Sequence, residues 1–483
     1  MPLSIQTFAN TFNPLPVRDM TWPPDEDQAR LDSYTRCSMI MDGDHLNVFS
    51  DRAELNRYGV YIPANISKKI VYATSDLLFG EPVALEYPEE ANQAGIDFCD
   101  ELWKEQKLQQ LYYEGSVDGG SLGDDVYQVR KEENQALIES VQAKNWFPVR
   151  DPDNVRKVLQ HRLAITHEVR INGKLREFVK MMIHEKGRII NQLWEVEGGK
   201  LKTPYGPGTD PWNTFMGVLP EVEETGVEDF LIVHIPSWRA ARQFFGEKEL
   251  EGIKELQSEL NSRLSQGSHV LTNHAEPIIK GPPNTILDEN NEYDASLRAF
   301  EISEDSEHEK IEYVTYDGKL SDGEAFIERI IDLMLLLTET SKDLLGIGKG
   351  GVEASGRALK FAARSTLAKV NRRRQNYNVG IPQCLLLAQM LEGISDPVRP
   401  KLVWSDGLPQ DDGELLEILD RRLANQTLSR KSFIMRMDDL GDDEADQALE
   451  AIDEDEATAT QNIVASRPRP PLAPVTQDLG EGL

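Results

Sequence analysis

Two glycine-rich motifs contain residues whose types and spacing could do chemistry. The first, Gly346-Ile347-Gly348-Lys349-Gly350-Gly351, satisfies the pattern GxGxxG, in which glycines let a backbone approach the phosphates of a dinucleotide. That fingerprint requires a preceding strand, whereas the apolar spacing before Gly346 predicts a long helix. We therefore interpret the motif as a loop between two helices and predict no cofactor.

The second motif, Gly119-Gly120-Ser121-Leu122-Gly123, fits GxSxG, which presents a nucleophilic serine on a turn from a strand into a helix. Here the expected order is inverted, because a helical pattern precedes the motif and a strand pattern follows it. A serine hydrolase also needs a histidine that accepts the serine proton, and no histidine stands in a context that identifies it. We favour a plain glycine turn and predict no catalytic residue.

The histidines do not form a recognisable metal site. His269 and His274 lie five positions apart, and His184-Glu185 and His167-Glu168 begin like HExxH but lack the second histidine. The stretch from Asp288 to Glu301 offers the oxygen ligands of a calcium loop but lacks the glycine that its turn requires. The sequence therefore predicts no bound metal.

Composition narrows the classes of protein. The 483 residues include 52 Lys and Arg against 83 Asp and Glu, a formal charge of −31 that disfavours simple electrostatic binding to DNA or anionic lipid. No purely apolar run exceeds the five residues Leu333 to Leu337, whereas a membrane span needs about 20. Cys37, Cys99 and Cys384 are odd in number and far apart, which is typical of reduced thiols. We predict several folded units and no membrane association.

The first half of the sequence predicts helices followed by an antiparallel meander of strands. Apolar residues at helical spacing predict helices over residues 64–78 and 91–113. Short alternating segments, separated by turns at Asn172-Gly173 and Lys186-Gly187, predict strands. These strands are expected over residues 126–130, 164–171, 178–184 and 189–196, with a long loop at 203–220 and a further strand at 230–235. The fold class predicted is α+β and helix-rich.

The second half contains long amphipathic helices. Leucines and isoleucines recur at helical spacing from Glu247 to Leu271, and a second helix follows Ser321 and continues to about Leu345. The second helix carries two apolar stripes, a face wide enough to indicate packing in an oligomer. Between the helices lie about 45 residues with three short segments, too few for a core of their own, which we expect to lean on a neighbouring chain. The segments are 278–280, 297–302 and 311–316.

Charge is segregated toward the C-terminus. No acidic residue occurs between Glu353 and Glu392, a stretch that predicts a third long helix and carries seven basic residues. They could meet DNA phosphate, a carboxylate of the same or a neighbouring chain, or solvent, and we favour pairing with carboxylates. A strand at 401–404, helices at 414–423 and 432–456, and an acidic block from Asp442 to Glu456 follow. The basic residues are Arg357, Lys360, Arg364, Lys369, Arg372, Arg373 and Arg374.

The order of these elements resembles the portal proteins of tailed bacteriophages, of the siphophage type. The resemblance extends from about Asn56 to Glu456. The strings that carry it are Lys68-Lys69-Ile70-Val71, Leu78-Phe79-Gly80-Glu81-Pro82-Val83, Gly246-Glu247-Lys248-Glu249-Leu250, Leu260-Asn261, Glu276-Pro277-Ile278-Ile279-Lys280-Gly281, Ala354-Ser355-Gly356-Arg357-Ala358-Leu359 and Leu428-Ser429-Arg430-Lys431-Ser432-Phe433.

The resemblance implies a portal-like architecture and a division of the chain. It comprises an N-terminal arm (1–30), a wing (31–240), stem helix one (241–272), a small α/β clip (273–321), stem helix two (322–343), a tunnel loop (344–356), the long helix and strand of the wing (357–408), crown helices (409–465) and a disordered tail (466–483).

The resemblance also implies a structural role without enzymatic activity. Portal proteins form a ring, usually of twelve subunits, at one capsid vertex, through which the terminase motor packages double-stranded DNA and the genome is later ejected. Expected partners are identical subunits, the terminase large subunit, major capsid and scaffolding proteins and a head-completion adaptor. The expected location is the virion, with assembly in the host cytoplasm. Alternatives are an acidic cytosolic oligomeric scaffold and a serine hydrolase using Ser121.

Three groups of residues follow as site candidates. The tunnel loop would approach DNA through Gly346, Gly348, Lys349, Gly350 and Gly351, and the seven basic residues of the third helix are further candidates for DNA contact. Packing between subunits would involve the stem residues Leu250, Ile253, Leu260, Leu264, Phe326, Ile330, Leu333 and Leu337.

Overall fold

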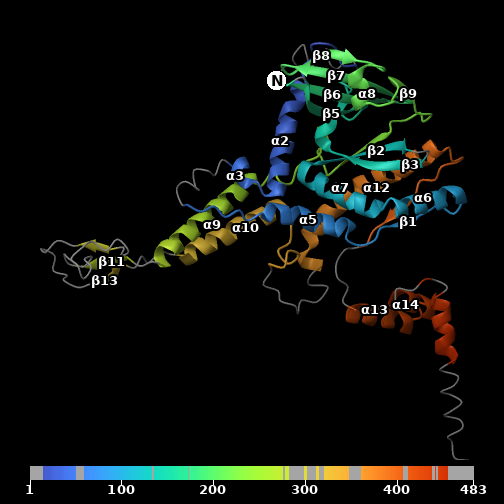
Figure 1. Ribbon diagram of the computed structural model, residues 1–483. Helices are drawn as coiled ribbons and strands as arrows, with labels where there is room; N and C mark the ends of the chain where they lie inside the picture. The colour runs from blue at the N-terminus through green and yellow to red at the C-terminus, as the bar shows by residue number, and fades with distance from the viewer. Residues whose placement is uncertain are drawn as a thin grey trace, which may run out of the picture. The chain divides into compact units, whose positions relative to one another are not determined.

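The computed structural model describes most of the chain as two compact units. The first unit comprises Met1–Val352 with Lys360–Gly407, and the second comprises Glu353–Leu359 with Leu408–Leu483. The residues described are 15–49, 59–132, 135–171, 173–275, 278–281, 299–301, 312–314, 320–347, 360–405, 412–437, 441 and 444–454. Helices and strands both contribute, so the predicted helix-rich α+β class is confirmed (Figure 1).

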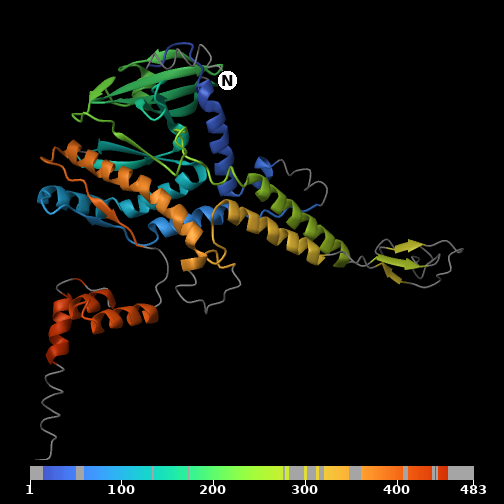
Figure 2. The ribbon, with the colours of Figure 1, turned by 180° about the vertical axis from the view of Figure 1, so that it is seen from behind.

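The helices of the first unit cover its sheets and form an extended pair (Figures 1 and 2). One begins inside the segment predicted to be an arm, and the single helix predicted over residues 91–113 is two helices. They are α2 (Asp25–Asp42), α3 (His45–Val48), α5 (Ile66–Phe79), α6 (Gln93–Glu105), α7 (Leu108–Leu122), α8 (Asp210–Phe215), α9 (Lys254–Ala275), α10 (Leu320–Leu337) and α12 (Arg364–Glu392).

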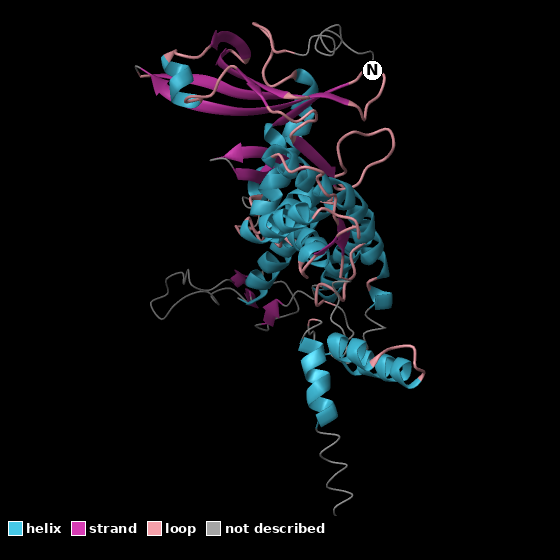
Figure 3. Cartoon of the chain, turned by 90° about the vertical axis from the view of Figure 1, so that its right-hand side faces the viewer, coloured by secondary structure: helices cyan, strands magenta, loops and turns pink. Residues whose placement is uncertain are grey.

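A six-stranded antiparallel sheet confirms the predicted meander (Figure 3). Its order is β4-β5-β6-β7-β8, with β9 pairing β7. Lys186-Gly187 joins β6 to β7 as a two-residue hairpin, and the φ of +87° at Gly187 explains why glycine stands there. The strands are β4 (Trp146–Arg150), β5 (Val158–Ile171), β6 (Lys174–Glu185), β7 (Arg188–Glu197), β8 (Lys200–Tyr205) and β9 (Val222–Glu224). The predicted loop 203–220 thus contains the end of β8 and all of α8.

A three-stranded sheet faces the larger one. Its order is β10-β2-β3, formed by Ile232–Pro236, Asp124–Glu132 and Gln135–Val141. Val126, Trp146, Leu163, Ile232 and Phe244 form a buried apolar cluster with residues from both sheets. Burial of both faces fits the continuous buried pattern over the first six residues of β2.

The paired helices α9 and α10 pack on each other and on α5. Asn65 begins α5 by accepting a hydrogen bond from the Lys68 amide at 2.9 Å. The predicted helix 247–271 begins only at Lys254, because Leu250 packs into a separate cluster with Tyr34 and Val71. The predicted helix 321–345 ends at Leu337, where Glu339 takes a φ of +54°.

The insert between these helices contains the three short segments predicted. Strand β11 (Ile278–Gly281) pairs in parallel with β12 (Ala299–Glu301) and antiparallel with β13 (Glu312–Val314). A separate two-stranded sheet joins distant parts of the chain: β1 (Ala84–Glu86) pairs with β14 (Lys401–Val403). The strand predicted at 401–404 is thereby confirmed.

The second unit is helical. It contains α13 (Asp412–Ala424), α14 (Arg430–Met437) and a helical segment at 444–454. The predicted helix 432–456 is therefore divided, and ion pairs Arg430–Asp453 and Lys431–Asp446 tie its two parts together at 3.3 and 2.8 Å. Across the described helices of both units, none combines the length and apolarity of a membrane span.

Candidate functional site

The apolar residues of the paired helices divide into buried and exposed sets. Ile253, Leu260, Ile330 and Met334 are at most 2% exposed and share one core with Ile70 of α5. Of the residues proposed for packing between subunits, Leu250, Ile253, Leu260 and Ile330 therefore already lie within the core of their own chain. We therefore correct the prediction for these four residues: they pack within their own chain. A side chain that has no accessible surface has none left to bury against a neighbouring subunit.

A second set on α10 remains exposed. Phe326 is 45% exposed and Leu337 is 61% exposed, while Leu333 between them and Leu264 on α9 are half-buried. Phe326, Leu333 and Leu337 lie within about 40° of one another around a helix of 3.6 residues per turn. The neighbouring stripe, which includes Ile331, packs toward the shared core. We define Phe326, Leu333 and Leu337 as the exposed stripe of α10.

Two basic residues of α12 are buried against one carboxylate. Lys369 Nζ lies 3.0 Å from Glu249 Oε2, and Arg373 Nη1 lies 3.8 Å from Glu249 Oε1. The side chain of Lys369 is 5% exposed, that of Glu249 is 6% exposed and that of Arg373 is 0% exposed. Arg373 Nη2 also donates to the carbonyl of Ser116 at 2.6 Å. Burial lowers the pKa of Lys369, and the charge of Glu249 partly offsets that effect. These two cations serve the fold of their own chain.

The other described basic residues of the stretch 357–374 lie nearer the surface. Arg372 pairs with Glu339, and Arg374 donates to the carbonyls of Leu77 and Ser405 at 2.9 and 2.6 Å. Lys360 and Arg364 are exposed, and Arg357 lies outside the described residues. Partners within the chain thus account for Lys369, Arg372, Arg373 and Arg374, one of the alternatives that the sequence left open.

The glycine cluster after α10 is described only at its start. Gly346 takes a φ of +71°, and its amide donates to the carbonyl of Asp343 at 3.1 Å in a turn. Gly348, Lys349, Gly350 and Gly351 lie outside the described residues. A turn at Gly346 therefore follows α10, and the rest of the predicted loop lies outside the described residues.

The GxSxG motif belongs to a helix rather than to a turn. Ser121 lies in α7, is 3% exposed, and donates through Oγ to the carbonyl of Asp118 at 3.1 Å. A Cβ atom added at Gly119 or Gly120 would lie 3.3 Å from the guanidinium of Arg373. The glycines therefore let α12 approach α7 closely, which accounts for the motif by packing.

An aspartate pair that sequence reasoning missed lies beneath the same helix. Asp125 is fully buried and accepts hydrogen bonds from the hydroxyls of Tyr127 and Tyr377 at 2.7 and 3.2 Å. Burial raises the pKa of Asp125 to about 7, although both hydroxyl bonds oppose the shift. Asp124 accepts from Tyr34, from His234 at 2.7 Å and from the Gly246 amide at 2.8 Å. The sequence signal that could have revealed this pair is two adjacent aspartates, Asp124 and Asp125, at the start of an apolar strand.

Replacement of Gly115 tests how tightly this cluster is packed. A Cβ atom at Gly115 would lie 2.0 Å from the Tyr127 hydroxyl and 2.7 Å from Asp125 Oδ1. We expect Gly115→Ala to lower the free energy of unfolding by about 1–3 kcal/mol through overpacking. The control Gly267→Ala in α9 has nothing within 4 Å of the new Cβ and should be neutral or stabilising. Equal urea midpoints for the two variants would contradict the close packing.

Three histidines gather between the two sheets. The Trp146 indole donates to His161 Nδ1 at 3.0 Å, Gln128 Nε2 lies 3.5 Å from His184 Nε2, and His234 contacts Asp124. Burial lowers the pKa of His161 to about 3, with repulsion from His184 and His234 adding to it, and lowers that of His184 to about 4. No group of metal-ligating side chains occurs in the described part of the chain. His184, considered from the sequence as part of a zinc motif, is a neutral core residue.

Comparison with known proteins bears on the second half of the chain. Residues 227–461 match the family model described as "Phage portal protein, SPP1 Gp6-like". No curated protein matches the sequence. The family match covers five of the strings from which the resemblance was inferred, and that resemblance is confirmed over this range.

Solved structures of gene transfer agent (GTA) particles are similar over 80% of this chain and 93% of theirs. The virion of the native particle is 12% identical with a TM-score of 0.44. The neck of the native particle, computed with C12 symmetry, is 12% identical with a TM-score of 0.43. The neck of the empty particle, computed with C6 symmetry, is 11% identical with a TM-score of 0.45.

Proposed function

We propose that the chain, whose residues 227–461 match the phage portal protein family, forms the ring at one capsid vertex through which DNA enters and leaves. The ring would hold twelve copies, serve the terminase motor during packaging, and dock a head-completion adaptor afterwards. The chain would lie in the virion after assembly in the host cytoplasm, in contact with capsid and scaffolding proteins. The family match is the observation that carries this proposal.

The described surface of α10 supports self-association. Phe326 and Leu337 keep 45% and 61% of their surface exposed, and a further leucine, Leu336, is 71% exposed. Full burial of such a side chain contributes about 1.5–3 kcal/mol, and about half of that surface remains to be buried here, which favours contact with an identical neighbour. The division into arm, wing, stem, clip, tunnel loop, crown and tail stays a proposal, as does DNA contact by Gly346, Lys349 and the exposed basic residues of α12.

Charge substitution on the exposed stripe tests the ring. We expect Phe326→Lys with Leu337→Lys to shift the protein from a species of twelve times the 54.5 kDa chain mass to smaller species. Each substitution removes apolar surface from the contact between subunits and places like charges there. The affinity between subunits should therefore fall at least about tenfold. Native mass measurement and negative-stain images provide the readout.

The matched control is Glu328→Lys, which places the same side chain at an exposed position about 160° around the same helix from Phe326. Ring assembly should survive in that variant. Wild-type protein that stays monomeric at high concentration and inside finished particles, or is missing from particles, would contradict the proposed function.

A further inference from the structure

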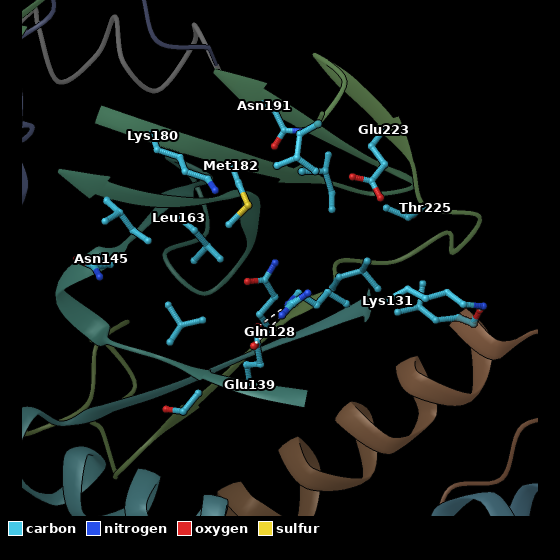
Figure 4. A pocket seen from close by; sticks show the side chains of 18 of the residues that line it. Gln128, Lys131, Glu139, Asn145, Leu163, Lys180, Met182, Asn191, Glu223 and Thr225 are labelled. Carbon is cyan, nitrogen blue, oxygen red and sulfur yellow. Dashed lines mark hydrogen bonds and ion pairs between the residues drawn. The ribbon is translucent and has the colours of Figure 1, made fainter. Parts of the chain in front are cut away.

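A cleft of mixed polar and apolar lining lies where the six-stranded sheet and the sheet β10-β2-β3 diverge (Figure 4). Its volume is about 670 Å³, and its lining includes Leu163 and Met182 from the larger sheet and Gln128 from β2. Leu163 and Met182 are directly paired across β5 and β6, so they belong to one face. The same face continues into the buried cluster around Trp146, which makes the cleft an extension of the space between the sheets.

Lys180 brings an uncompensated positive charge into this cleft. Its side chain is half-buried, and no carboxylate among the described residues pairs with it. The neighbouring cation Arg130 is held by Glu139 at 2.6 Å and by Glu132 at 2.9 Å. Burial lowers the pKa of Lys180, and the charge of Arg130 adds to the effect. An anionic group placed beside Lys180 would relieve both penalties.

Asn191 brings an unused acceptor into the same cleft. Its side chain is 1% exposed, and Nδ2 donates to the carbonyl of Pro220 at 2.8 Å. That bond fixes the orientation of the amide, because a reversed amide would place two oxygens against each other. Oδ1 has no hydrogen-bond partner. A buried unpaired acceptor costs about 1–3 kcal/mol, so a ligand N–H at this point would be favourable.

Two carboxylates stand at the other end of the cleft. Glu223 and Glu224 of β9 are exposed and have no ion-pair partner among the described residues. Strand register places Lys180 opposite Leu193, Met182 opposite Asn191, and Glu223 opposite Ile189. Lys180, Asn191 and Glu223 therefore follow one another at steps of two residues on the neighbouring strands β6, β7 and β9, in the order that Figure 4 displays. The two ends are offset by about 13 Å along the strands and about 10 Å across them, or about 16 Å in all.

We propose that this cleft binds an extended segment of another protein in which an acidic and a basic residue stand about four positions apart. The acidic side chain pairs with Lys180, a backbone N–H between the two donates to Asn191 Oδ1, and the basic side chain reaches Glu223 and Glu224. An extended chain advances about 3.3 Å per residue, so four to five residues span the separation of the two charged ends. A small carboxylate could meet Lys180 but could not also reach Glu223. This inference does not depend on the proposed ring.

Random heptapeptides displayed on yeast provide the probe, with the full-length protein as bait. We expect the selected peptides to carry an acidic and a basic residue three to five positions apart. Binding of a selected peptide, measured by fluorescence anisotropy, should weaken at least about tenfold in Lys180→Met and in the double variant Glu223→Gln with Glu224→Gln. The control Lys174→Met removes an exposed lysine of the same strand and should bind as the wild type does.

Three results would overturn the proposal. Selected peptides could lack the pair of charges, Lys180→Met could bind them as tightly as the wild type, or acetate at millimolar concentration could displace them completely. The last result would assign the cleft to small anions instead of a protein segment. The circular dichroism of each variant is compared with that of the wild type, so that lost binding is not confused with unfolding.

Discussion

Replacement of Glu249 by glutamine is expected to lower the free energy of unfolding by about 3–5 kcal/mol. The substitution keeps the shape of the side chain but leaves Lys369 and Arg373 buried without their carboxylate, 3.0 and 3.8 Å away in the native protein. Breaking a buried pair from one side is costly because the remaining charge cannot be solvated. Urea unfolding followed by circular dichroism gives the midpoint, which serves better than an extrapolated free energy for a chain of two units.

Glu255→Gln is the matched control for this prediction. Glu255 lies at the start of α9, only a few residues from Glu249, but its side chain is exposed, so its urea midpoint should stay near the wild-type value. Addition of Lys369→Gln to Glu249→Gln should recover part of the loss, because one uncompensated charge is removed. If Glu249→Gln and Glu255→Gln unfold at the same urea concentration, the buried pair does not stabilise the fold.

Acidification is expected to destabilise the protein through its buried histidines. The pKa of His161 is lowered to about 3 and that of His184 to about 4, from 6.5 in the unfolded chain. The unfolded chain therefore binds more protons below pH 6.5, and the stability present above that pH is lost as pH falls toward 4. At pH 4.5 two such groups would cost about 5 kcal/mol together, at 1.36 kcal/mol per pH unit.

Asp125 has the opposite effect on stability over an overlapping range of pH. Its pKa is raised to about 7 in the fold from 3.8, so its contribution is fully present below pH 3.8 and is lost as pH rises through 7. Asp125→Asn keeps an oxygen that both tyrosine hydroxyls can reach. The variant should be more stable than the wild type at pH 8 and should lose stability more steeply below pH 6.5.

Urea midpoints between pH 8 and pH 4.5 separate these two effects. His161→Gln retains an acceptor for the Trp146 indole and should flatten the loss on acidification, whereas the half-buried His167 provides the control His167→Gln. Parallel pH profiles for wild type, His161→Gln and Asp125→Asn would show that these buried groups do not govern the pH dependence.

Local pattern in the sequence was enough to predict most elements. Alternation of apolar and polar residues located the strands of the six-stranded sheet, and Lys186-Gly187 located a hairpin, because both signals depend on neighbours along the chain. Helical spacing likewise located α5, α9 and α10 but placed the start of α9 seven residues early. Leu250 and Ile253 continue the periodic pattern, yet Leu250 belongs to another core, and periodicity cannot distinguish one apolar environment from another.

The sequence by itself determined the α+β class, the order of the elements and, through that order, the resemblance to the portal family. Only the tertiary structure decided which apolar stripe of α10 faces inward, that Lys369 and Arg373 share Glu249, and that the glycines around Ser121 admit Arg373. Lys369 and Glu249 are 120 positions apart, so no local pattern connects them. Periodicity reports that a face is apolar or charged, whereas the identity of its partner depends on how distant elements pack.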